Sequence, residues 1–374
     1  MYDLILTSCG DPRDPNTWSG TPNNILRALE RRGLRVHGVD WSLASRRIDR
    51  PGRNPFLRLA KRFRQVTHTG FQDLRTANPR GRAATYVAEQ ARLTGCTKIL
   101  HTGTLDLPLP LPDPLQAHCL FCDTTWDLWA RDATNMSQFD AAYVRAADEL
   151  ERAAYHQVEH IFPIGSYVTG SLVDHYGVEP TRITPVGTGL NTITPYNGEK
   201  DYANGHVLTV AKGRFEDKGG SLLLDAFRLA RQTRPDLKLV IVGSQTNARF
   251  VLDPTNVTVT GFVPDDQLQR LFEEAALFAM PALNEPWGLV FLEALACKTP
   301  VLGLARNALP EMTRSGRYGF LVDEAAPEAV ASALVGALGD PERLRRMGIE
   351  GQAHCLKTYS WDAVAERIAT RILA

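Results

Sequence analysis

The chain has little cysteine for its length, no excess charge of either sign and no long apolar run. Its 42 Lys and Arg residues are matched by 42 Asp and Glu residues, which argues against a protein that coats nucleic acid or an anionic surface along its whole length. A membrane-spanning helix would need about 18 or more consecutive apolar residues, and no such stretch occurs. The first residues lead directly into a strand, without the basic leader or cleavage site of a signal peptide. We therefore expect a soluble, cytoplasmic protein that binds no nucleic acid.

The scarcity of cysteine excludes a disulfide scaffold. Six cysteines in 374 residues are expected to be reduced, buried thiols. Cys119 and Cys122 have C-x-x-C spacing, but no second pair accompanies them, so a metal or redox role is the less favoured alternative. The remaining composition is that of a globular protein, 44% hydrophobic, with enough residues for two or three domains.

Short apolar runs alternate with helical patterns in the first half of the chain, a pattern typical of parallel sheets covered by helices. The expected strands are residues 3–8, 34–39, 98–101, 120–123, 160–163 and 183–186. Apolar residues at three- and four-residue spacing predict helices over 21–32, 81–94, 137–159 and 166–176.

A second series of the same kind follows residues 187–205, whose four glycines and three asparagines predict a linker. The expected strands after the linker are 206–211, 237–243, 257–260, 277–280, 300–304 and 319–322, with helices starting near Gly220, Asp265, Gly288 and Ala326. We therefore predict an α/β protein with two Rossmann-like domains, residues 1–190 and 191–374, facing each other across a cleft. The final helix, 360–373, follows the second sheet and could pack on either domain.

The most informative stretch is 284–296, in which every residue after Gly288 is apolar except Glu293. Pro286 and Gly288 mark the start of a helix. A carboxylate in so apolar a helix is expected to be buried, and a buried charge costs several kcal/mol unless it finds partners. Glu293 therefore indicates either a hydrogen-bonding ligand, with a phosphate at the free N–H groups of the helix, or a buried arginine as partner.

This stretch resembles a known family. EPWGLVFLEALACKTPVL, with seven residues between Glu285 and Glu293, is similar to the E-x7-E segment of retaining glycosyltransferases of family 4, which have the two-domain GT-B fold. The resemblance continues through AKGRFEDKGGSLLLDAF and VTVTGFVPDDQLQ and covers the second half, while WSGTPNNILRALERRG and SYVTGSLVDHYGVEP match more weakly in the first half. It implies a metal-independent hexosyltransferase whose substrate is a nucleoside diphosphate sugar, with an acceptor hydroxyl and no cofactor.

The resemblance also implies roles for residues of the second domain. Glu293 would accept hydrogen bonds from the donor ribose, and the amides of the helix start would hold the distal phosphate. Glu285 would lie beside the transferred sugar, where it could hold hydroxyls or stabilise positive charge; its alternative is a solvated loop carboxylate. The donor-binding residues implied in this way are Gly20, Lys212, Gly243, Phe262, Gly288, Leu289, Val290 and Glu293.

Three cations lie at a glycine-rich turn between an expected strand and helix, namely Lys212, Arg214 and Lys218. Cations at such a turn can clamp a diphosphate and stabilise its developing charge, so Arg214 and Lys218 are catalytic candidates by resemblance. The family usually has its Arg five residues before the Lys, whereas Arg214 is four before Lys218. The cation that fills the Arg role therefore stays open, and a solvated loop is the alternative.

In the first domain, the turn after the first strand is expected to face the acceptor. Gly20 would let backbone approach a ligand closely, and Thr21 is expected to cap the following helix. The resemblance implies acceptor-side roles for Trp18, Ser19 and Thr21, with an ordinary strand-to-helix turn as the alternative. Asp123, at the end of an expected strand, matches a region that places a His or Asp near the reacting centre.

Other motifs indicate different functions. Residues 156–160 read H-x-x-E-H, a zinc-peptidase arrangement, but His160 opens a run typical of a strand, so a zinc hydrolase is a remote alternative. Gly187 to Gly189 lacks the third glycine of a dinucleotide fingerprint. The stronger alternative is a GT-B-like sugar or nucleotide binding protein without turnover, which would lose Glu285 or the cations that this chain keeps.

One region departs from the overall charge balance. Residues 27–82 hold fifteen Lys or Arg residues against four acidic ones. Within it, 54–66 is predicted to be an amphipathic helix with Arg58, Lys61, Arg62 and Arg64 on its polar side. A packed helix with a solvated basic face is the common case. The alternative is that the basic segment 46–64 meets an anionic or lipid-linked acceptor, or binds peripherally to a membrane.

Overall fold

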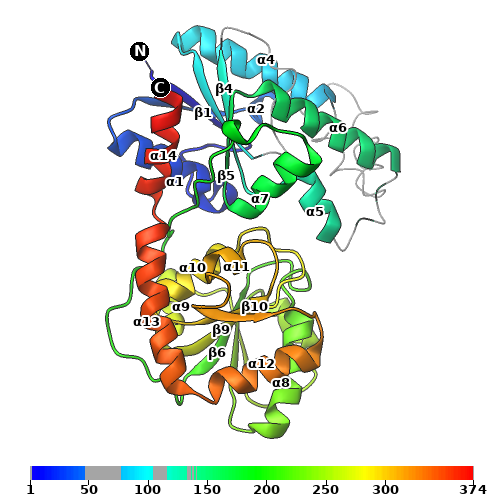
Figure 1. Ribbon diagram of the computed structural model, residues 1–374, viewed down its shortest axis with the longest axis vertical. Helices are drawn as coiled ribbons and strands as arrows, with labels where there is room; N and C mark the ends of the chain where they lie inside the picture. The colour runs from blue at the N-terminus through cyan, green and yellow to red at the C-terminus, as the bar shows by residue number, and fades with distance from the viewer. Residues whose placement is uncertain are drawn as a thin grey trace. The chain divides into compact units, whose positions relative to one another are not determined.

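The computed structural model describes residues 2–46, 77–103, 116–132, 136, 139 and 141–373. These residues form two compact α/β units (Figure 1). Unit 1 consists of Met1–Thr188 and Trp361–Ala374, and unit 2 of Gly189–Ser360. The predicted helix 54–66 and residues 47–64 of the basic segment 46–64 lie outside the described residues.

The sheet of unit 1 has five parallel strands in the order β2-β1-β3-β4-β5. They are β1 (Leu4–Ser8), β2 (Val36–Asp40), β3 (Lys98–Thr102), β4 (Ala117–Cys122) and β5 (His160–Pro163). The sixth predicted strand, 183–186, is wrong: only a bridge between Ile183 and Ile161 forms. The N–H groups of Thr184 and Val186 donate to the carbonyls of Ile161 and Pro163, each at 2.9 Å, but Pro163 of β5 has no N–H to donate in return, which explains why no second bridge forms.

Helices cover this sheet on both faces. They are α1 (Thr21–Arg31), α2 (Leu43–Arg46), α4 (Ala77–Thr94), α5 (Trp126–Asp132), α6 (Ala141–Gln157), α7 (Ser166–Gly170) and α14 (Trp361–Leu373), with short 3-10 turns at Thr17–Gly20 and Pro180–Arg182. The helix predicted over 166–176 is helical through His175, but its type changes, because α7 gives way to a π-helix at Ser171–His175.

The last helix, α14, packs against α1 within unit 1 (Figure 1). Arg31 forms an ion pair with Asp362 at 2.7 Å, and Lys98 Nζ donates to the carbonyl of Ile372 at 2.6 Å. The chain therefore returns to the first sheet after completing the second.

The sheet of unit 2 has six parallel strands in the order β11-β10-β9-β6-β7-β8. They are β6 (His206–Ala211), β7 (Leu239–Gly243), β8 (Val257–Gly261), β9 (Ala275–Ala279), β10 (Val301–Leu304) and β11 (Gly319–Val322). The order reverses between β6 and β9, and the crevice at the carboxyl ends of two such strands is where open α/β sheets bind ligands.

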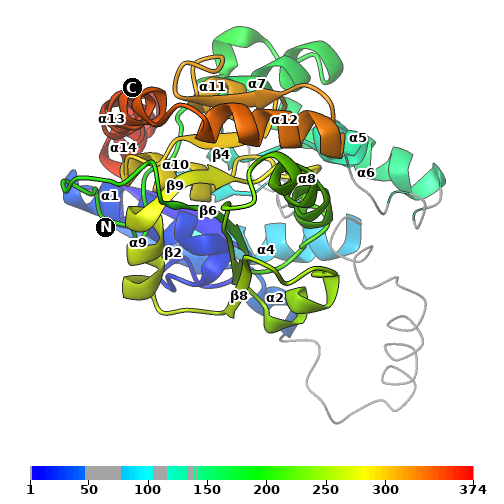
Figure 2. The same cartoon turned by 90° about the horizontal axis from the view of Figure 1, so that it is seen from below.

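The helices of unit 2 are α8 (Gly220–Thr233), α9 (Asp265–Glu274), α10 (Leu289–Ala296), α11 (Leu309–Met312), α12 (Pro327–Leu338) and α13 (Pro341–Thr358), with a 3-10 helix η8 at Gln245–Phe250. Helices α8 and α12 pack against each other on one face of the sheet. Helices α10 and α13 form a second packed pair (Figures 1 and 2). Strands covered on both faces must be apolar throughout, and Leu277, Phe278 and Ala279 of β9 are fully buried.

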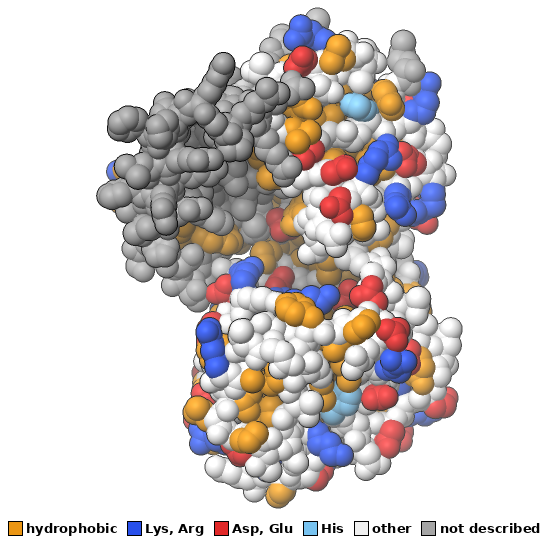
Figure 3. Space-filling model, turned by 180° about the vertical axis from the view of Figure 1, so that it is seen from behind, with side chains coloured by type: hydrophobic (Ala, Val, Ile, Leu, Met, Phe, Trp, Pro, Cys, Tyr) orange, Lys and Arg blue, Asp and Glu red, His pale blue; other side chains and the backbone are white. Residues whose placement is uncertain are grey.

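The surface charges and the cysteines are those of an ordinary globular protein. Lys and Arg side chains are interspersed with Asp and Glu on the face of unit 2 shown in Figure 3. Among the described residues, no helix combines the length and apolar character that a membrane crossing requires. The six cysteines form no disulfide, and Cys119 and Cys122 are buried in β4. Burial raises the pKa of Cys119 to about 12 and that of Cys122 well above its ordinary value, so both thiols stay protonated.

Candidate functional site

The candidate site of unit 2 is built by two loops at the reversal of strand order. Loop 212–219 follows β6 and leads into α8, and loop 280–288 follows β9 and leads into α10. The two loops are bound to each other, because the carbonyl of Asp217 accepts hydrogen bonds from the N–H groups of Leu283 (2.7 Å) and Asn284 (2.9 Å). Residues almost seventy positions apart in the sequence are thereby brought together.

Gly219 is required where the loops meet. Its φ is +73°, and a Cβ at this position would collide with the carbonyl oxygen of Pro281. Glycine alone meets both demands without strain, because it has no Cβ and adopts positive φ freely. The close packing of the two loops therefore requires a glycine at position 219 of this turn.

The three predicted cations have different surroundings. Lys218 Nζ lies 3.2 Å from Glu285 Oε2, and both side chains are about one-fifth exposed. Arg214 donates from Nε to Asp217 Oδ2 at 2.8 Å and from a terminal nitrogen to the carbonyl of Asn284 at 2.9 Å. Lys212 is exposed and forms no ion pair with the described residues. The structure therefore pairs Lys218 directly with Glu285, two of the three catalytic candidates of this unit.

The loop that carries Glu285 is held on its other side by two residues that the sequence did not single out. Asn307 donates from Nδ2 to the carbonyl of Glu285 at 3.2 Å, and Arg306 donates to the carbonyl of Leu283 at 3.3 Å. Asn307 has φ +51°, a conformation that Asn tolerates better than most residues. A small pocket beside Glu285 is lined by Met280, Ala282, Trp287, Phe291, Leu304, Arg306 and Leu309. Glu285 thus stands against a mostly apolar wall.

Gly288 is the N-cap of helix α10; it has φ +79° and precedes the first helical residue, Leu289. Leu289 and Val290 form the first turn, where backbone N–H groups have no acceptor inside the helix. The helix dipole makes this end positive, so it can bind an anion. The predicted phosphate-binding residues therefore lie where a phosphate could accept their hydrogen bonds.

Glu293 lies one turn further along α10. The predicted alternative, a buried arginine partner, is not found: no ion pair joins Glu293 to any residue of the described ranges. Burial raises the pKa of the Glu293 carboxyl, while the charges of Lys212 and Lys218 act in the opposite direction. A carboxylate without a protein donor, next to two lysines and a positive helix end, is suited to bind a polar ligand.

The other two predicted donor residues of unit 2 also lie at the carboxyl edge of its sheet. Gly243 ends β7 with φ +150°, and a Cβ there would collide with the carbonyl of Ala211, so its glycine is explained by strand packing. Phe262 directly follows β8 and is 67% exposed. An exposed aromatic ring at this edge offers a surface on which a flat ring can stack.

In unit 1, the turn after β1 has a strained backbone. Trp18 (φ +43°) and Ser19 (φ +54°) are both left-handed, and Gly20 follows at φ +80°. Such residues cost of order 1–3 kcal/mol each and cluster at functional sites. The prediction that Thr21 caps α1 is wrong, because Thr21 is helical and Gly20 occupies the cap position.

The remaining predicted residue of unit 1, Asp123, follows β4 at the carboxyl edge of that sheet. Its carbonyl accepts a hydrogen bond from the hydroxyl of Tyr167. Two residues earlier, the ring of Phe121 contacts Trp18 edge to face, with centroids 5.9 Å apart. The strained turn and the end of β4 are therefore neighbours within unit 1.

The H-x-x-E-H motif does not form a two-histidine helix face. Helix α6 ends at Gln157, so His156 lies on the helix and His160 in β5. His156 Nε2 lies 3.0 Å from the carbonyl of Tyr176, and His160 Nε2 lies 2.8 Å from Thr184 Oγ1. The His160 Nδ1 atom accepts a hydrogen bond from Arg371, so each ring is held by a different structural contact.

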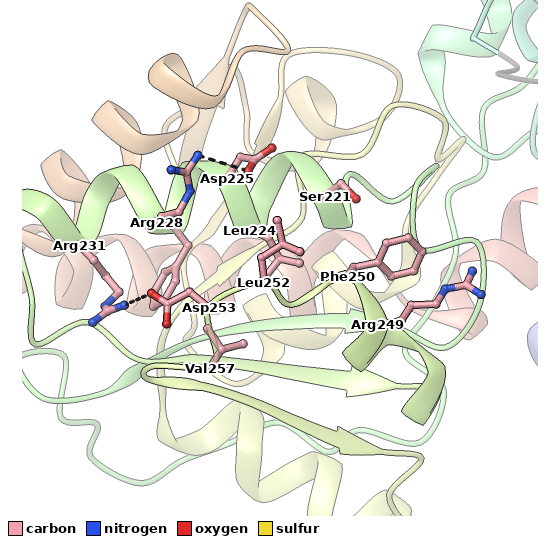
Figure 4. A pocket seen from close by; sticks show the side chains of 11 residues that line it. Ser221, Leu224, Asp225, Arg228, Arg231, Arg249, Phe250, Leu252, Asp253 and Val257 are labelled. Atoms are coloured by element: carbon pink, nitrogen blue, oxygen red, sulfur yellow. Dashed lines mark hydrogen bonds and ion pairs between the residues drawn. The ribbon is translucent and has the colours of Figure 1, made fainter.

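Unit 2 also has a surface pocket outside these loops, between α8 and residues 249–257 (Figure 4). Leu224, Phe250 and Val257 give it apolar walls. Two of its arginines are paired with acids of the same pocket, Arg231 with Asp253 at 3.1 Å and Arg228 with Asp225 at 3.7 Å. We therefore place the candidate site at the two loops and the helix start that follows them, where Lys212 and Glu293 form no ion pair with any residue that the structure describes.

Comparisons with known proteins find a family model that matches within unit 2 and relatives that match part of the chain. Residues 199–354 match the family model described as Glycosyl transferases group 1. The D-inositol 3-phosphate glycosyltransferase of Segniliparus rotundus is 32% identical over 218 residues, which are 53% of this chain and 48% of the relative. The alpha-maltose-1-phosphate synthase of Mycolicibacterium smegmatis is 26% identical over 249 residues, 58% of this chain and 64% of the relative. The chain thus spans about half the length of the first relative and less than two thirds of the second.

Solved structures are similar over the whole chain. Sucrose-phosphate synthase from Thermosynechococcus elongatus has a TM-score of 0.72 at 17% identity and covers 99% of this chain and 98% of its own. HepE from Anabaena, in complex with UDP and glucose, has a TM-score of 0.65 at 16% identity and covers 100% of both chains. The likeness confirms the predicted fold: the chain has the α/β fold of GT-B glycosyltransferases, with two Rossmann-like domains.

Proposed function

We propose that this protein is a metal-independent, retaining glycosyltransferase that moves a sugar, a hexose in our proposal, from a nucleoside diphosphate to an acceptor hydroxyl. The observation that carries the proposal is the meeting of Lys218, Glu285 and the start of α10 at the reversal of strand order in unit 2. The match of residues 199–354 to the group 1 glycosyl transferase model supports it.

The residues of unit 2 divide the work between nucleotide and sugar. The N–H groups of Leu289 and Val290 would donate to the distal phosphate, and Glu293 would accept hydrogen bonds from the ribose hydroxyls. Lys218 would neutralise charge that develops on the diphosphate as the glycosidic bond breaks. Glu285 would hold the sugar or stabilise positive charge at its anomeric carbon. The acceptor hydroxyl would attack from the face that the diphosphate leaves, and a diphosphate oxygen would take its proton.

We further propose that the acceptor is a small phosphorylated polyol or sugar. The names of the two relatives support this, since one acts on an inositol phosphate and the other makes a maltose phosphate. The excess of Lys and Arg in residues 27–82 would favour an anionic acceptor. Trp18, Ser19 and Thr21 would line the acceptor side, with Gly20 allowing close approach and Asp123 near the reacting centre.

Incubation with UDP-, GDP- and ADP-sugars, with and without EDTA, tests the proposal. We expect slow hydrolysis of one donor class without acceptor, faster turnover with a phosphorylated polyol, and a product whose anomeric configuration, read by NMR, matches the donor. Activity should survive EDTA, because lysines rather than a metal balance the diphosphate. Nucleotide binding without hydrolysis or transfer would instead favour a GT-B-like binding protein, and loss in EDTA with recovery on added zinc would favour a hydrolase.

A further inference from the structure

Of the three cations in the glycine-rich turn, Arg214 makes the most side-chain hydrogen bonds to other residues of the protein. Its Nε donates to Asp217 Oδ2 and a terminal nitrogen donates to the carbonyl of Asn284. A guanidinium binds a phosphate best through two parallel N–H groups on one edge. Because Nε and one terminal nitrogen are committed to different acceptors, a two-point contact with phosphate through that edge would require breaking these bonds.

The backbone explains why the side chain turns toward the protein. Arg214 has φ +54°, and its partner Asp217 is three residues ahead in the same turn. The spacing of four residues between Arg214 and Lys218 is closed by a hydrogen bond from the Lys218 N–H to the Arg214 carbonyl at 3.0 Å. The turn is therefore tight. Arg214 and Lys218 lie at its two ends, and their side chains contact different carboxylates, Asp217 and Glu285.

Arg214 and Asp217 together link the two loops at the residue before Glu285. The Asp217 carbonyl accepts from the N–H groups of Leu283 and Asn284, and Arg214 donates to the carbonyl of Asn284. Both sides of the Asn284 backbone are thus bound to loop 212–219. Movement of the Arg214 side chain would free the carbonyl side of this peptide and leave the two bonds to the Asp217 carbonyl as its remaining link to loop 212–219.

Lys212 has the opposite character. It follows β6 directly, is exposed, and has no ion pair or hydrogen bond from its ammonium group within the described ranges. It lies at the carboxyl end of β6, at the reversal of strand order, and its charge, like that of Lys218, opposes the rise in the pKa of Glu293 that burial causes. An ammonium group that is uncommitted and near Glu293 is available to an anionic ligand.

We propose that Arg214 is a positioning residue that braces loop 280–288 against loop 212–219, and that Lys212, with Lys218, supplies the positive charge for the donor diphosphate. The role of Lys212 rests on the proposed function, whereas the brace does not. In this assignment Lys212, and not Arg214, takes the phosphate-binding role of the family arginine, which the four-residue spacing between Arg214 and Lys218 had left open.

The brace is tested without any nucleotide. Hydrogen exchange of a peptide that covers residues 281–287, measured by mass spectrometry, should accelerate by about tenfold or more in Arg214→Gln and Asp217→Ala. The first variant loses the bond to the Asn284 carbonyl and the second loses the carboxylate that holds Arg214, so the two loops should separate more often and expose the amides of Leu283 and Asn284. Arg214→Lys should behave like Arg214→Gln, because an ammonium group lacks the planar fork that reaches both acceptors. Lys212→Gln and the exposed control Arg346→Gln should leave this exchange unchanged. Unchanged exchange in Arg214→Gln overturns the brace.

The charge assignment is tested by titrating UDP, GDP and ADP and by donor hydrolysis. Lys212→Gln should weaken binding of the preferred diphosphate by about tenfold or more, whereas Arg214→Gln should change it by less than about threefold and lower kcat instead. Lys357→Gln on α13 is the matched control. A larger binding loss in Arg214→Gln than in Lys212→Gln overturns the assignment. If the wild-type protein binds none of the three diphosphates, the proposed function and the role of Lys212 both fail, and the exchange experiment alone decides the brace.

Discussion

Lys218 Nζ and Glu285 Oε2 lie 3.2 Å apart in unit 2, although their positions in the sequence are 67 residues apart. Each belongs to a loop after a different strand, β6 and β9, at the reversal of strand order. A diphosphate bound at this edge would compete with Glu285 for the ammonium group of Lys218. Binding of the donor would then loosen the carboxylate from its partner, next to the sugar on which we propose that it acts.

The pair predicts opposite effects for its two neutral variants. Lys218→Gln should weaken nucleoside diphosphate binding by about tenfold or more, since a positive charge next to the phosphates is lost. Glu285→Gln should bind the diphosphate as well as the wild type or better, because Lys218 no longer has a competing anion, while turnover falls by about 100-fold. Calorimetry and donor hydrolysis measure the two effects. Equal losses of affinity in both variants would contradict the division of roles.

A second prediction concerns Glu293 and stability. Burial raises the pKa of its carboxyl above the ordinary 4.5, so the folded protein holds this proton more tightly than the unfolded chain. The associated stability is fully present below pH 4.5 and is lost as the pH rises through the folded pKa. Glu293→Gln should therefore unfold at a higher temperature than the wild type at pH 7, and the advantage should vanish in acid.

Substitution of Glu293 by Ala or Gln should also weaken nucleotide binding. Glu293→Ala removes the proposed acceptor of the ribose hydroxyls, so affinity should fall by about tenfold or more, whereas Glu293→Gln keeps one acceptor oxygen and should lose less. Thermal unfolding with and without nucleotide gives both quantities from one experiment. Unchanged affinity in both variants would remove α10 from the donor site.

The sequence predicted the strands better than the details between them. Residues 160–163, 206–211 and 319–322 form strands at the predicted bounds, because short apolar runs between turn residues indicate buried parallel strands. The change from α-helix to π-helix at Ser171 was not predictable in this way. Its hydroxyl lies 2.8 Å from Thr125 Oγ1 and donates to Asp127 Oδ2, which are contacts with residues more than forty positions earlier.

The candidate site was predictable in its charged residues and not in its supports. Glu293 and the cations are conspicuous because charged residues are unusual in an apolar helix and next to glycines. Asp217 was missed because two of its contacts are made by its backbone carbonyl, which carries no signal of residue type. The pairing of Lys218 with Glu285 depends on the strand order, which local patterns do not specify.

Gly219 predicts a sharp contrast with Gly213 in the same turn. Gly219→Ala would place a Cβ against the Pro281 carbonyl at positive φ, so it should lower the free energy of unfolding by about 2 kcal/mol or more. Gly213 has open space around the corresponding position, and Gly213→Ala should change it by no more than about 0.5 kcal/mol. Urea unfolding of both variants makes the comparison. A tolerated Gly219→Ala would show that the two loops approach less closely.

A fourth prediction concerns Lys200, a partly buried lysine in the segment before β6. Lys200 Nζ donates to the carbonyl of Phe272 at 2.7 Å and to Thr299 Oγ1 at 2.8 Å, and burial lowers its pKa from 10.5 to about 7. Between these values the unfolded chain binds a proton that the folded protein does not, so stability from this group rises with pH, by at most about 1.4 kcal/mol per pH unit. It is lost again as the pH falls through about 7.

Lys200→Met should remove this dependence on pH. The difference in free energy of unfolding between the wild type and Lys200→Met should widen in favour of the wild type from pH 7 to pH 9, which lies inside the window set by the two pKa values. Lys357→Met, at an exposed position on α13, should show no such trend. A parallel pair of curves for wild type and Lys200→Met would contradict the lowered pKa.

The last prediction concerns the basic segment, whose residues 47–64 lie outside the described part of the chain. Four cations of the predicted helix, Arg58, Lys61, Arg62 and Arg64, would contribute about 1 kcal/mol each near an anionic bilayer, enough for reversible attachment at low salt. We expect partial co-sedimentation with vesicles that contain an anionic lipid, none with neutral vesicles, and loss of binding when all four are changed to Gln. Because screening shortens the reach of these charges to about 8 Å at physiological salt, added salt should release the protein. Failure to bind either kind of vesicle would remove the membrane contact, and the four-Gln variant would then be compared with the wild type for KM toward a phosphorylated acceptor, where an increase would assign the segment to acceptor binding.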